Sequence, residues 1–337
     1  MCGNMALHLV YEKPRTPSTR IRLTQMAPHL ESRGLSCRVV AYPRGARARR
    51  AFGASLAAGD VVLIHRARPT AREAHWWQSL PVRRIYDFDD AVMWGRRRGL
   101  RGVLTRRNRS AGFARALACV DAATCGNAFL AAQCGDLPTA VVPSAVALDV
   151  PCHTPRALAT PFRVGWVGRT TNLRYVRELG AALAELARRV ALEVVCVSDD
   201  ALALPGCRVV NIRWTPEGEA TAVATFDAGI MPLSLDDPWS RGKCSYKLLQ
   251  YMAAGVPAVG SDVGMNADLI QHGRNGLLAG SARDWADALA SLAADPALRA
   301  RLGHAGRETA QGYGYSAIAD RLAAFVSRVA LGSSASR

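Results

Sequence analysis

Short apolar segments alternate with amphipathic or polar segments along the first half of the chain. The apolar segments are rich in β-branched residues and have the length of strands. Residues 21–34 show a helical pattern that ends at Gly34, a residue suited to a C-terminal cap. Because strands alternate with helices, the pattern indicates parallel βαβ units. We predict strands at residues 5–11, 37–42, 60–65, 83–88 and 139–144.

The same alternation restarts after residues 149–161, a segment that is rich in proline and poor in periodicity. Here we predict strands at residues 162–168, 192–198, 207–214, 227–233, 257–261 and 276–280. We predict helices at residues 173–189, 244–254, 283–295, 296–311 and 315–331. The two patterns together predict an α/β protein with two doubly wound Rossmann-like domains that face a cleft.

The predicted boundaries follow from this restart. Residues 1–155 form the N-terminal Rossmann-like domain, and residues 156–315 form the C-terminal one. A C-terminal helix and a frayed Ser-rich tail occupy residues 316–337. At 337 residues, half of them apolar, the chain is long enough for two cores of this kind.

The composition limits the partners and the compartment that the protein can have. The formal net charge is +16, and the first 155 residues carry 23 Arg and Lys against 10 Asp and Glu. A basic half of this kind suits an anionic partner. No secretion signal and no membrane-spanning run are visible, and the nine cysteines form no C-x-x-C pair. We therefore expect a soluble cytoplasmic protein with reduced core thiols.

The stretch RGKCSYKLLQYMAAGVP, residues 241–257, stands out because the chain has only three lysines and two of them, Lys243 and Lys247, lie here. Good helix formers follow, and Gly255 and Pro257 end the helix. Positive side chains at a helix N-terminus are unfavourable unless an anion compensates them. The pattern therefore predicts a phosphate site, with a solvated basic turn as the alternative.

A second glycine and arginine pair follows a predicted strand in GWVGRTTN, residues 165–172. Gly168 permits close approach of the backbone, and Arg169 can bind two phosphate oxygens with its guanidinium. Alone this motif is weak, but it gains weight beside the lysine-bearing helix.

Together these motifs resemble those of the retaining, two-domain (GT-B) glycosyltransferases of family 4. The matching stretches are GWVGR, FDAGIMPL, KLLQYMAAGVPAVGSDVG and HGRNGLLAG, within residues 162–315. The first half matches more loosely, through PSTRIRLTQMAPHLESRG and IYDFDDAVMW, which are similar to those of a bacterial subgroup.

The resemblance implies a reaction and a set of partners. A sugar moves from a nucleoside diphosphate sugar, held by the second domain, to an acceptor hydroxyl held by the first, with retention of the anomeric configuration. The acceptor is a sugar, a lipid-linked glycan or a small molecule, in polysaccharide, glycolipid or glycosylated-metabolite synthesis. The implied route is front-side attack in which a donor phosphate oxygen takes the acceptor proton, with no protein nucleophile.

The resemblance also implies roles for individual residues. Basic side chains replace a metal ion, so no metal or other cofactor is expected. The expected diphosphate-binding residues are Gly168, Arg169, Lys243 and Lys247. The expected nucleoside-binding residues are Ile212, Arg213, Trp214 and Gln250.

Two positions depart from the family pattern. Gly242 and Gln250 stand where the family has two glutamates. Gln250 can still bond ribose hydroxyls without charge, whereas Gly242 offers the donor sugar only its backbone N–H. The alternative function is therefore a catalytically impaired subunit that binds a nucleotide sugar.

The first half contributes further candidates near predicted strand ends. His65 lies where the family has a residue facing the donor sugar, which makes it the candidate catalytic residue, with a structural histidine as the alternative. If the strand continues that far, alternation sends Asp87 and Asp89 to one face and Asp90 to the other. We expect Asp89 and Asp90 to bind acceptor hydroxyls or to cap a loop rather than to hold a metal.

Basic residues supply the last candidates. Arg20 and Arg22 are expected to meet phosphate or acceptor, with a plain surface role as the alternative. Residues 94–115 hold seven arginines between positions 96 and 109. This segment suits an anionic surface at the inner face of a membrane or, equally, a solvated helix face. Nucleic acid fits poorly, because no aromatic residues alternate with the arginines.

Overall fold

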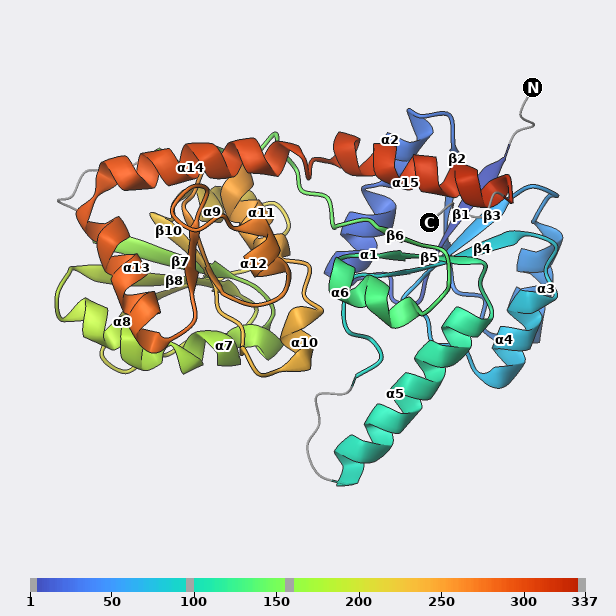
Figure 1. Cartoon of the computed structure of the whole chain (residues 1–337), viewed down its shortest axis with the longest axis horizontal. Helices are drawn as coiled ribbons and strands as arrows, with labels where there is room; N and C mark the ends of the chain where they lie inside the picture. Colours follow the sequence, from blue (N-terminus) through green and yellow to red (C-terminus); the bar gives the residue numbers. More distant parts are fainter. Residues whose placement is uncertain (1–4, 95–99, 155–160, 333–337) are drawn as a thin grey trace. The chain divides into compact units, whose positions relative to one another are not determined.

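The structure of the protein is a computed structural model that describes residues 5–94, 100–154 and 161–332. It divides into two units (Figure 1). The first unit runs to Ala145 and includes the short segment 242–244 and the chain from Tyr315 onward. The second unit comprises Val146–Arg241 and Ser245–Gly314.

The first unit is built on a six-stranded parallel sheet with the order β2-β1-β3-β4-β5-β6. The inner strands β1 and β3 are buried along almost their whole length, whereas β2 at one edge is largely exposed. The strands are β1 (Ala6–Tyr11), β2 (Ser36–Ala41), β3 (Val61–His65), β4 (Arg83–Phe88), β5 (Ala122–Cys125) and β6 (Thr139–Val141). Sequence patterning missed β5, because its residues AATC are small and lack a strong β signal.

Helices cover this sheet on both faces, as a doubly wound fold requires. The predicted helix 21–34 is split, because Pro28 has no N–H to continue the ladder from the preceding π-helical turn. The helical segments of the unit are α1 (Pro17–Thr19), η1 (Arg20–Thr24), α2 (Ala27–Glu31), α3 (Gly45–Ala54), α4 (Ala71–Gln78), α5 (Leu100–Ala118), α6 (Ala128–Ala131), η2 (Ala132–Cys134) and α15 (Tyr315–Ala330).

The second unit repeats the plan with a six-stranded parallel sheet of order β12-β11-β10-β7-β8-β9. Its strands are β7 (Phe162–Val167), β8 (Leu192–Ser198), β9 (Arg208–Arg213), β10 (Ala228–Met231), β11 (Ala258–Ser261) and β12 (Leu277–Ala279). Each corresponds to a predicted strand. Buried aromatic residues, among them Trp166, Phe226 and Tyr251, fill the core on the two faces of this sheet.

The helices of the second unit include the predicted motif helix, now α11. Its helical segments are η3 (Thr170–Asn172), α7 (Leu173–Glu178), α8 (Gly180–Ala187), α9 (Glu219–Ala224), α10 (Pro238–Arg241), α11 (Tyr246–Ala253), α12 (Met265–Leu269), α13 (Ala282–Ala294) and α14 (Pro296–Gln311). The predicted helix 173–189 is therefore two helices, α7 and α8. The two sheets confirm the predicted fold class of two Rossmann-like units.

The C-terminal helix α15 packs on the first unit, beside α2 (Figure 1). Arg33 donates to Asp320 at 2.6 Å, and the His29 ring stacks on Tyr315 with centroids 5.0 Å apart. The first unit thus takes up the helix that we predicted as a separate segment, and its main stretch ends at Ala145, before the predicted boundary at 155. Within the described residues, no helix is both long and apolar enough to cross a membrane.

Candidate functional site

The carboxyl ends of the parallel strands are where ligands bind in sheets of this kind, and most candidate residues lie there. In the second unit, Gly168 follows β7 and Lys247 lies in the first turn of α11. A Cβ atom on Gly168 would lie 2.7 Å from Lys247 Cε and 2.7 Å from Trp166 Cζ2. Only glycine therefore leaves room for the lysine stem to lie across the end of the strand.

The ammonium group of Lys247 lies 5.7 Å from the centre of the Trp166 ring. Arg169 directly follows Gly168 and is exposed. Gln250 lies three residues after Lys247 and therefore on the same side of α11, where it is half-buried. The structure thus brings Gly168 and Lys247 together at one edge of the second sheet, with Gln250 on the same side of α11, and the donor-binding roles of the three stay predictions.

Three of the predicted nucleoside-binding residues, Ile212, Arg213 and Trp214, lie at the end of β9 or directly after it. Ile212 is 37% exposed, and Arg213 is exposed as well. Trp214 is held in place at both ends, because its backbone N–H donates to the Ser198 carbonyl at 3.1 Å and its indole N–H donates to Glu219 at 2.9 Å. This edge presents a fixed indole and an exposed aliphatic side chain.

Lys243 has a different environment from Lys247. It belongs to the first unit, where its Nζ lies 3.0 and 3.2 Å from the two carboxylate oxygens of Asp90. The neighbouring Gly242 packs tightly, since a Cβ atom there would lie 2.8 Å from Ala91 Cβ. The structure therefore groups Lys243 with first-unit carboxylates, and it explains why position 242 carries no side chain. A role for either residue in donor binding stays a prediction.

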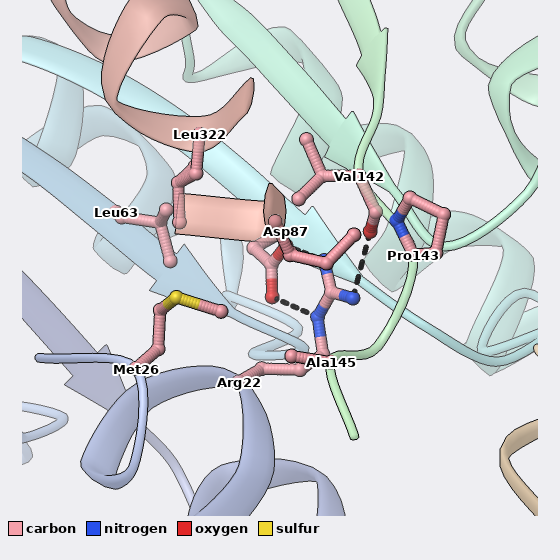
Figure 2. Close-up of a pocket in the computed structure, with 9 residues that line it drawn as sticks. Arg22, Met26, Leu63, Asp87, Val142, Pro143, Ala145 and Leu322 are labelled. Atoms are coloured by element: carbon pink, nitrogen blue, oxygen red, sulfur yellow. Dashed lines mark hydrogen bonds and ion pairs between the residues drawn. The ribbon is translucent and has the colours of Figure 1, made fainter. Parts of the chain in front are cut away.

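A buried ion pair lies at the carboxyl edge of the first sheet. Arg22, on η1, donates through Nε to Asp87 Oδ2 at 2.9 Å, through Nη2 to Asp87 Oδ1, and through Nη1 to the Val142 carbonyl at 2.8 Å (Figure 2). Thr124 donates to the same carboxylate at 2.7 Å. Burial alone raises the pKa of Asp87, but the charge and hydrogen bonds of Arg22 outweigh it and hold this pKa below its usual range.

The cavity beside this pair is about 10 Å³ in volume and is lined by apolar residues such as Met26, Leu63 and Leu322 (Figure 2). That volume is about the least that holds one water molecule, so no sugar fits there. Arg22 thus serves the interior of the first unit in this structure, and its predicted contact with a ligand stays a prediction. Arg20, on the same turn η1, is half-buried.

His65, the last residue of β3, has both ring nitrogens in hydrogen bonds. Nδ1 lies 2.7 Å from Asp87 Oδ2, and Nε2 lies 2.8 Å from Ser18 Oγ. The side chain is almost fully buried. The sequence placed His65 correctly at a strand end, but in this geometry a second residue, Ser18, lies next to its outer nitrogen.

Arg66 contacts the two other carboxylates at this edge, those of Asp89 and Asp90. Its Nη1 donates to Asp89 at 3.1 Å, and its Nη2 lies 3.6 Å from Asp90. The predicted alternation of Asp89 and Asp90 required the strand to continue that far. It does not apply, because β4 ends at Phe88 and both carboxylates lie near Arg66.

Three comparisons show which known proteins this chain resembles in sequence and in fold. Residues 161–295 match the family model described as "Glycosyl transferases group 1". Sucrose-phosphate synthase from Thermosynechococcus elongatus superposes with a TM-score of 0.71 at 15% identity, covering 98% of this chain and 100% of that one. HepE from Anabaena, solved with UDP-glucose, superposes with a TM-score of 0.69 at 15% identity, covering 96% of this chain and 99% of its own. Residues 161–295 thus match a glycosyltransferase domain, and the chain has the two-domain GT-B fold of these solved structures.

A curated relative agrees over a shorter stretch. The O-antigen biosynthesis protein RfbC of Myxococcus xanthus is 32% identical over 177 residues, which make up 48% of this chain. The match covers only 13% of RfbC, so the chain spans a small part of that relative. The likeness to the solved structures concerns the fold, and the group 1 domain coincides with most of the second unit.

Two further predictions, a basic surface at residues 94–115 and the absence of a metal ion, concern residues that the structure describes only in part. Of residues 94–115, residues 95–99 lie outside the described residues, and residues 100–115 make up most of α5. Arg107 there is exposed, whereas Arg109 donates to the Trp94 carbonyl at 3.1 Å. Among the described residues, no cluster of three His, Cys, Asp or Glu side chains could hold a metal ion.

Sequence reasoning missed three residues at these edges. Ser18 lay inside the quoted PSTR segment but carried no signal of its own, and Arg66 was hidden in an arginine-rich chain. Ser245 precedes α11 with φ of 48°, and its hydroxyl donates to Asn266 at 2.7 Å. Arg66 and Ser245 are the only non-glycine residues with positive φ in the described ranges 5–94, 100–154 and 161–332. Such backbone strain tends to occur at functional sites.

Proposed function

We propose that this protein transfers a sugar from a nucleoside diphosphate sugar to an acceptor hydroxyl, with retention of the anomeric configuration. The proposal extends to polysaccharide, glycolipid or glycosylated-metabolite synthesis as its setting. No metal ion takes part. The acceptor side of the reaction belongs to the first unit, where α5 is a candidate contact with an anionic membrane surface.

One observation carries the proposal: Lys247 crosses Gly168 at the end of β7, with Arg169 exposed beside it. A lysine ammonium and an arginine guanidinium at the carboxyl edge of a parallel sheet suit a diphosphate. Their charge has its greatest effect as the glycosidic bond breaks, because negative charge then builds on the leaving oxygen. In this role the two cations do the work that a metal ion does elsewhere.

The solved neighbours support a nucleotide-sugar donor. HepE structures contain UDP, UDP with glucose, and UDP-glucose, and they share the fold over nearly the whole chain. In our proposal the nucleoside lies against β9, beside Ile212 and the fixed indole of Trp214. Gln250 bonds the ribose hydroxyls as a neutral acceptor and donor.

A second function has an observation in its favour. Gly242 replaces a family carboxylate, and its contact with Ala91 leaves no space for a side chain. A chain without that carboxylate is also compatible with a subunit that binds a nucleotide sugar and does not turn it over. The two functions differ in one measurable property, which is release of the nucleoside diphosphate.

The test combines binding with turnover. Thermal unfolding of the full chain is followed with UDP-glucose, UDP-galactose, UDP-N-acetylglucosamine and GDP-mannose, because a bound ligand raises the apparent stability. Release of UDP or GDP is then measured with a mixture of methyl glycosides and glycerol as acceptors. Lys247→Ala should abolish both signals, whereas the exposed Lys13→Ala is the matched control and should preserve them.

Binding without release under every acceptor condition supports the non-catalytic subunit. Absence of any stabilisation by nucleotide sugars contradicts both functions. Equal effects of Lys247→Ala and Lys13→Ala contradict the proposed donor site while leaving glycosyl transfer in place.

A further inference from the structure

A cavity of about 360 Å³ lies at the amino ends of the strands of the first sheet. Its walls come from the segments that lead into β3, β4 and β5, and from Ala330 at the end of α15. All of the residues that line it belong to the first unit. Ligand-binding cavities commonly measure about 300 to 1,000 Å³, so this one has the size of a small-molecule site.

This cavity is separate from the candidate site at the carboxyl edge of the same sheet. Asp60, which lines the cavity, comes directly before β3, whereas His65 ends that strand. Because β3 has five residues and a strand rises about 3.3 Å per residue, its two ends are roughly 13 Å apart. A molecule in the cavity therefore lies at the opposite end of the strands from the proposed acceptor edge.

The two carboxylates in the wall already have protein donors. Asp121 accepts hydrogen bonds from the Arg84 backbone N–H at 2.8 Å, from its Nε at 3.0 Å and from its Nη2 at 3.2 Å. Burial raises the pKa of Asp121, but the hydrogen bonds and charge of Arg84 outweigh it and hold this pKa below its usual range. Asp60 accepts from two backbone N–H groups, at 3.0 and 2.9 Å, and lies 3.0 Å from His8 Nε2. The wall therefore offers little to a cationic ligand.

Arg83 differs from the neighbouring Arg84 in its contacts. Arg84 is held by Asp121 and also donates through Nη1 to the Trp77 carbonyl at 2.7 Å. Arg83 makes one long contact, from Nη1 to Asp121 Oδ1 at 3.4 Å, and its side chain is 50% exposed. A guanidinium has five N–H donors, and within the described ranges the other four of Arg83 have no protein acceptor. Since Arg84 already offsets the charge of Asp121, the Arg83 guanidinium remains available to an anion.

The rest of the wall is largely aliphatic. Leu80, Pro81 and Val82 come directly before β4, and Ala330 completes this side. Val82 is buried, and Leu80 and Ala330 are half-buried. None of the residues that line the cavity, all of which the structure describes, is aromatic, so a nucleobase would find no ring to stack on. The wall suits a short aliphatic chain rather than a nucleoside.

We propose that this cavity binds a small organic anion, with a carboxylate or phosphate group on Arg83 and a short aliphatic part against Leu80, Val82 and Ala330. A guanidinium binds either kind of anionic group through paired N–H donors. The ligand is chemically unlike a nucleotide sugar, and the bound anion takes no part in the transfer itself. This inference goes beyond the proposed function and does not depend on it.

The experiment measures binding of acetate, butyrate and propyl phosphate to the full chain, by titration calorimetry and thermal unfolding at constant ionic strength. Calorimetry should show one saturable site, and the bound anion should raise the apparent stability by mass action. Butyrate should bind on the order of tenfold more tightly than acetate, because each buried methylene contributes about fourfold. Tighter binding of butyrate than of propyl phosphate assigns a carboxylate, the reverse assigns a phosphate, and either result supports the site.

Two variants test the charge and the cavity separately. Arg83→Ala removes the guanidinium and should weaken the binding of every probe by about tenfold or more, as expected for a hydrogen bond to a charged group. Ala330→Leu keeps Arg83 but narrows the cavity, so it should weaken butyrate more than acetate. Arg283→Ala is the matched control and should bind all probes as the wild type does. The Arg283 side chain is 89% exposed and has a similarly long contact, 3.5 Å, with Asp287.

Three results would overturn the inference. Equal binding by the wild type and Arg83→Ala excludes the anion site and makes any stabilisation a general effect of salt. Binding that depends on Arg83 but is unchanged in Ala330→Leu assigns the anion to a surface arginine instead of the cavity. Equal affinity for acetate and butyrate excludes the aliphatic wall as a contact. Failure of nucleotide sugars to bind contradicts the proposed function and leaves these results unaffected, so the two failures are distinguishable.

Discussion

The basic side chains at the carboxyl edges of the two sheets have different neighbours. In the first unit, Arg22 lies against Asp87, and Lys243 lies against Asp90. In the second unit, Lys247 lies across a glycine and beside an aromatic ring, and Arg169 is exposed. In our proposal, the first edge orients neutral acceptor hydroxyls, and the lysine and arginine of the second edge bind a diphosphate.

The largest predicted effect comes from removing the carboxylate that neutralises Arg22 at the first edge. Asp87→Ala leaves the Arg22 guanidinium buried without its partner, so the first unit should lose about 3 to 5 kcal/mol of stability. Urea unfolding of the full chain, followed by circular dichroism, measures the loss. Asp320→Ala is the matched control, because its side chain is 67% exposed against Arg33 and an exposed ion pair contributes little. Equal losses in the two variants would refute the buried pair as a major source of stability.

Acid titration sharpens this prediction. The pKa of Asp87 is lowered from its ordinary value of 3.8 in the folded protein, so its contribution is complete above that value and declines as the pH falls below it. Between about pH 5 and about pH 3, the range in which ordinary carboxyl groups take up protons, the wild type should therefore lose more stability than Asp87→Ala. Parallel acid curves for the two proteins would contradict this.

The sequence predicted the meeting of Gly168 and Lys247 better than the contacts of the first edge, for a physical reason. Gly168 and Lys247 carry their signal in local patterns, since a strand end and a helix start each have a recognisable composition. The hydrogen bonds among Ser18, His65 and Asp87 join three segments that lie far apart in the sequence, so no local pattern contains them. Likewise, the predicted pairing of Lys243 with Lys247 rested on their spacing, and spacing does not reveal a competing carboxylate such as Asp90.

Adding a methyl group at Gly168, where the second edge is tightly packed, should have the next largest effect on stability. Gly168→Ala puts a methyl group 2.7 Å from both Lys247 Cε and the Trp166 ring, so the lysine must move. Overpacking of this kind costs about 1 to 3 kcal/mol, and we expect donor affinity to fall about tenfold as Lys247 is displaced. Titration calorimetry with the stabilising nucleotide sugar measures the affinity. Gly180→Ala is the control, since its new methyl would lie 3.6 Å from Leu204 in ordinary contact, and unchanged affinity is expected there.

A similar loss of stability, without an effect on donor affinity, distinguishes the two positions where the family has glutamates. Gly242→Glu should destabilise the first unit by about 1 to 3 kcal/mol without raising turnover, because Ala91 Cβ lies 2.8 Å from the new Cβ. Gln250→Glu keeps the size of the side chain at a half-buried position and should leave stability nearly unchanged. Thermal unfolding and diphosphate release are measured for both variants. Faster release by Gly242→Glu would show that this edge can accept a carboxylate, contrary to the packing.

The smallest effect tests whether the second edge stores backbone strain, as the first does at Arg66. Ser245 has φ of 48°, is buried, and donates to Asn266. Ser245→Gly and Ser245→Ala both remove that hydrogen bond, so the difference between them isolates the backbone. Glycine adopts positive φ readily, whereas alanine keeps a Cβ that opposes it, so the glycine variant should be more stable by about 1 kcal/mol. The difference in free energy of unfolding between the two variants measures this strain directly. An alanine variant at least as stable as the glycine variant would mean that the turn before α11 is relaxed, and that strain distinguishes the acceptor edge alone.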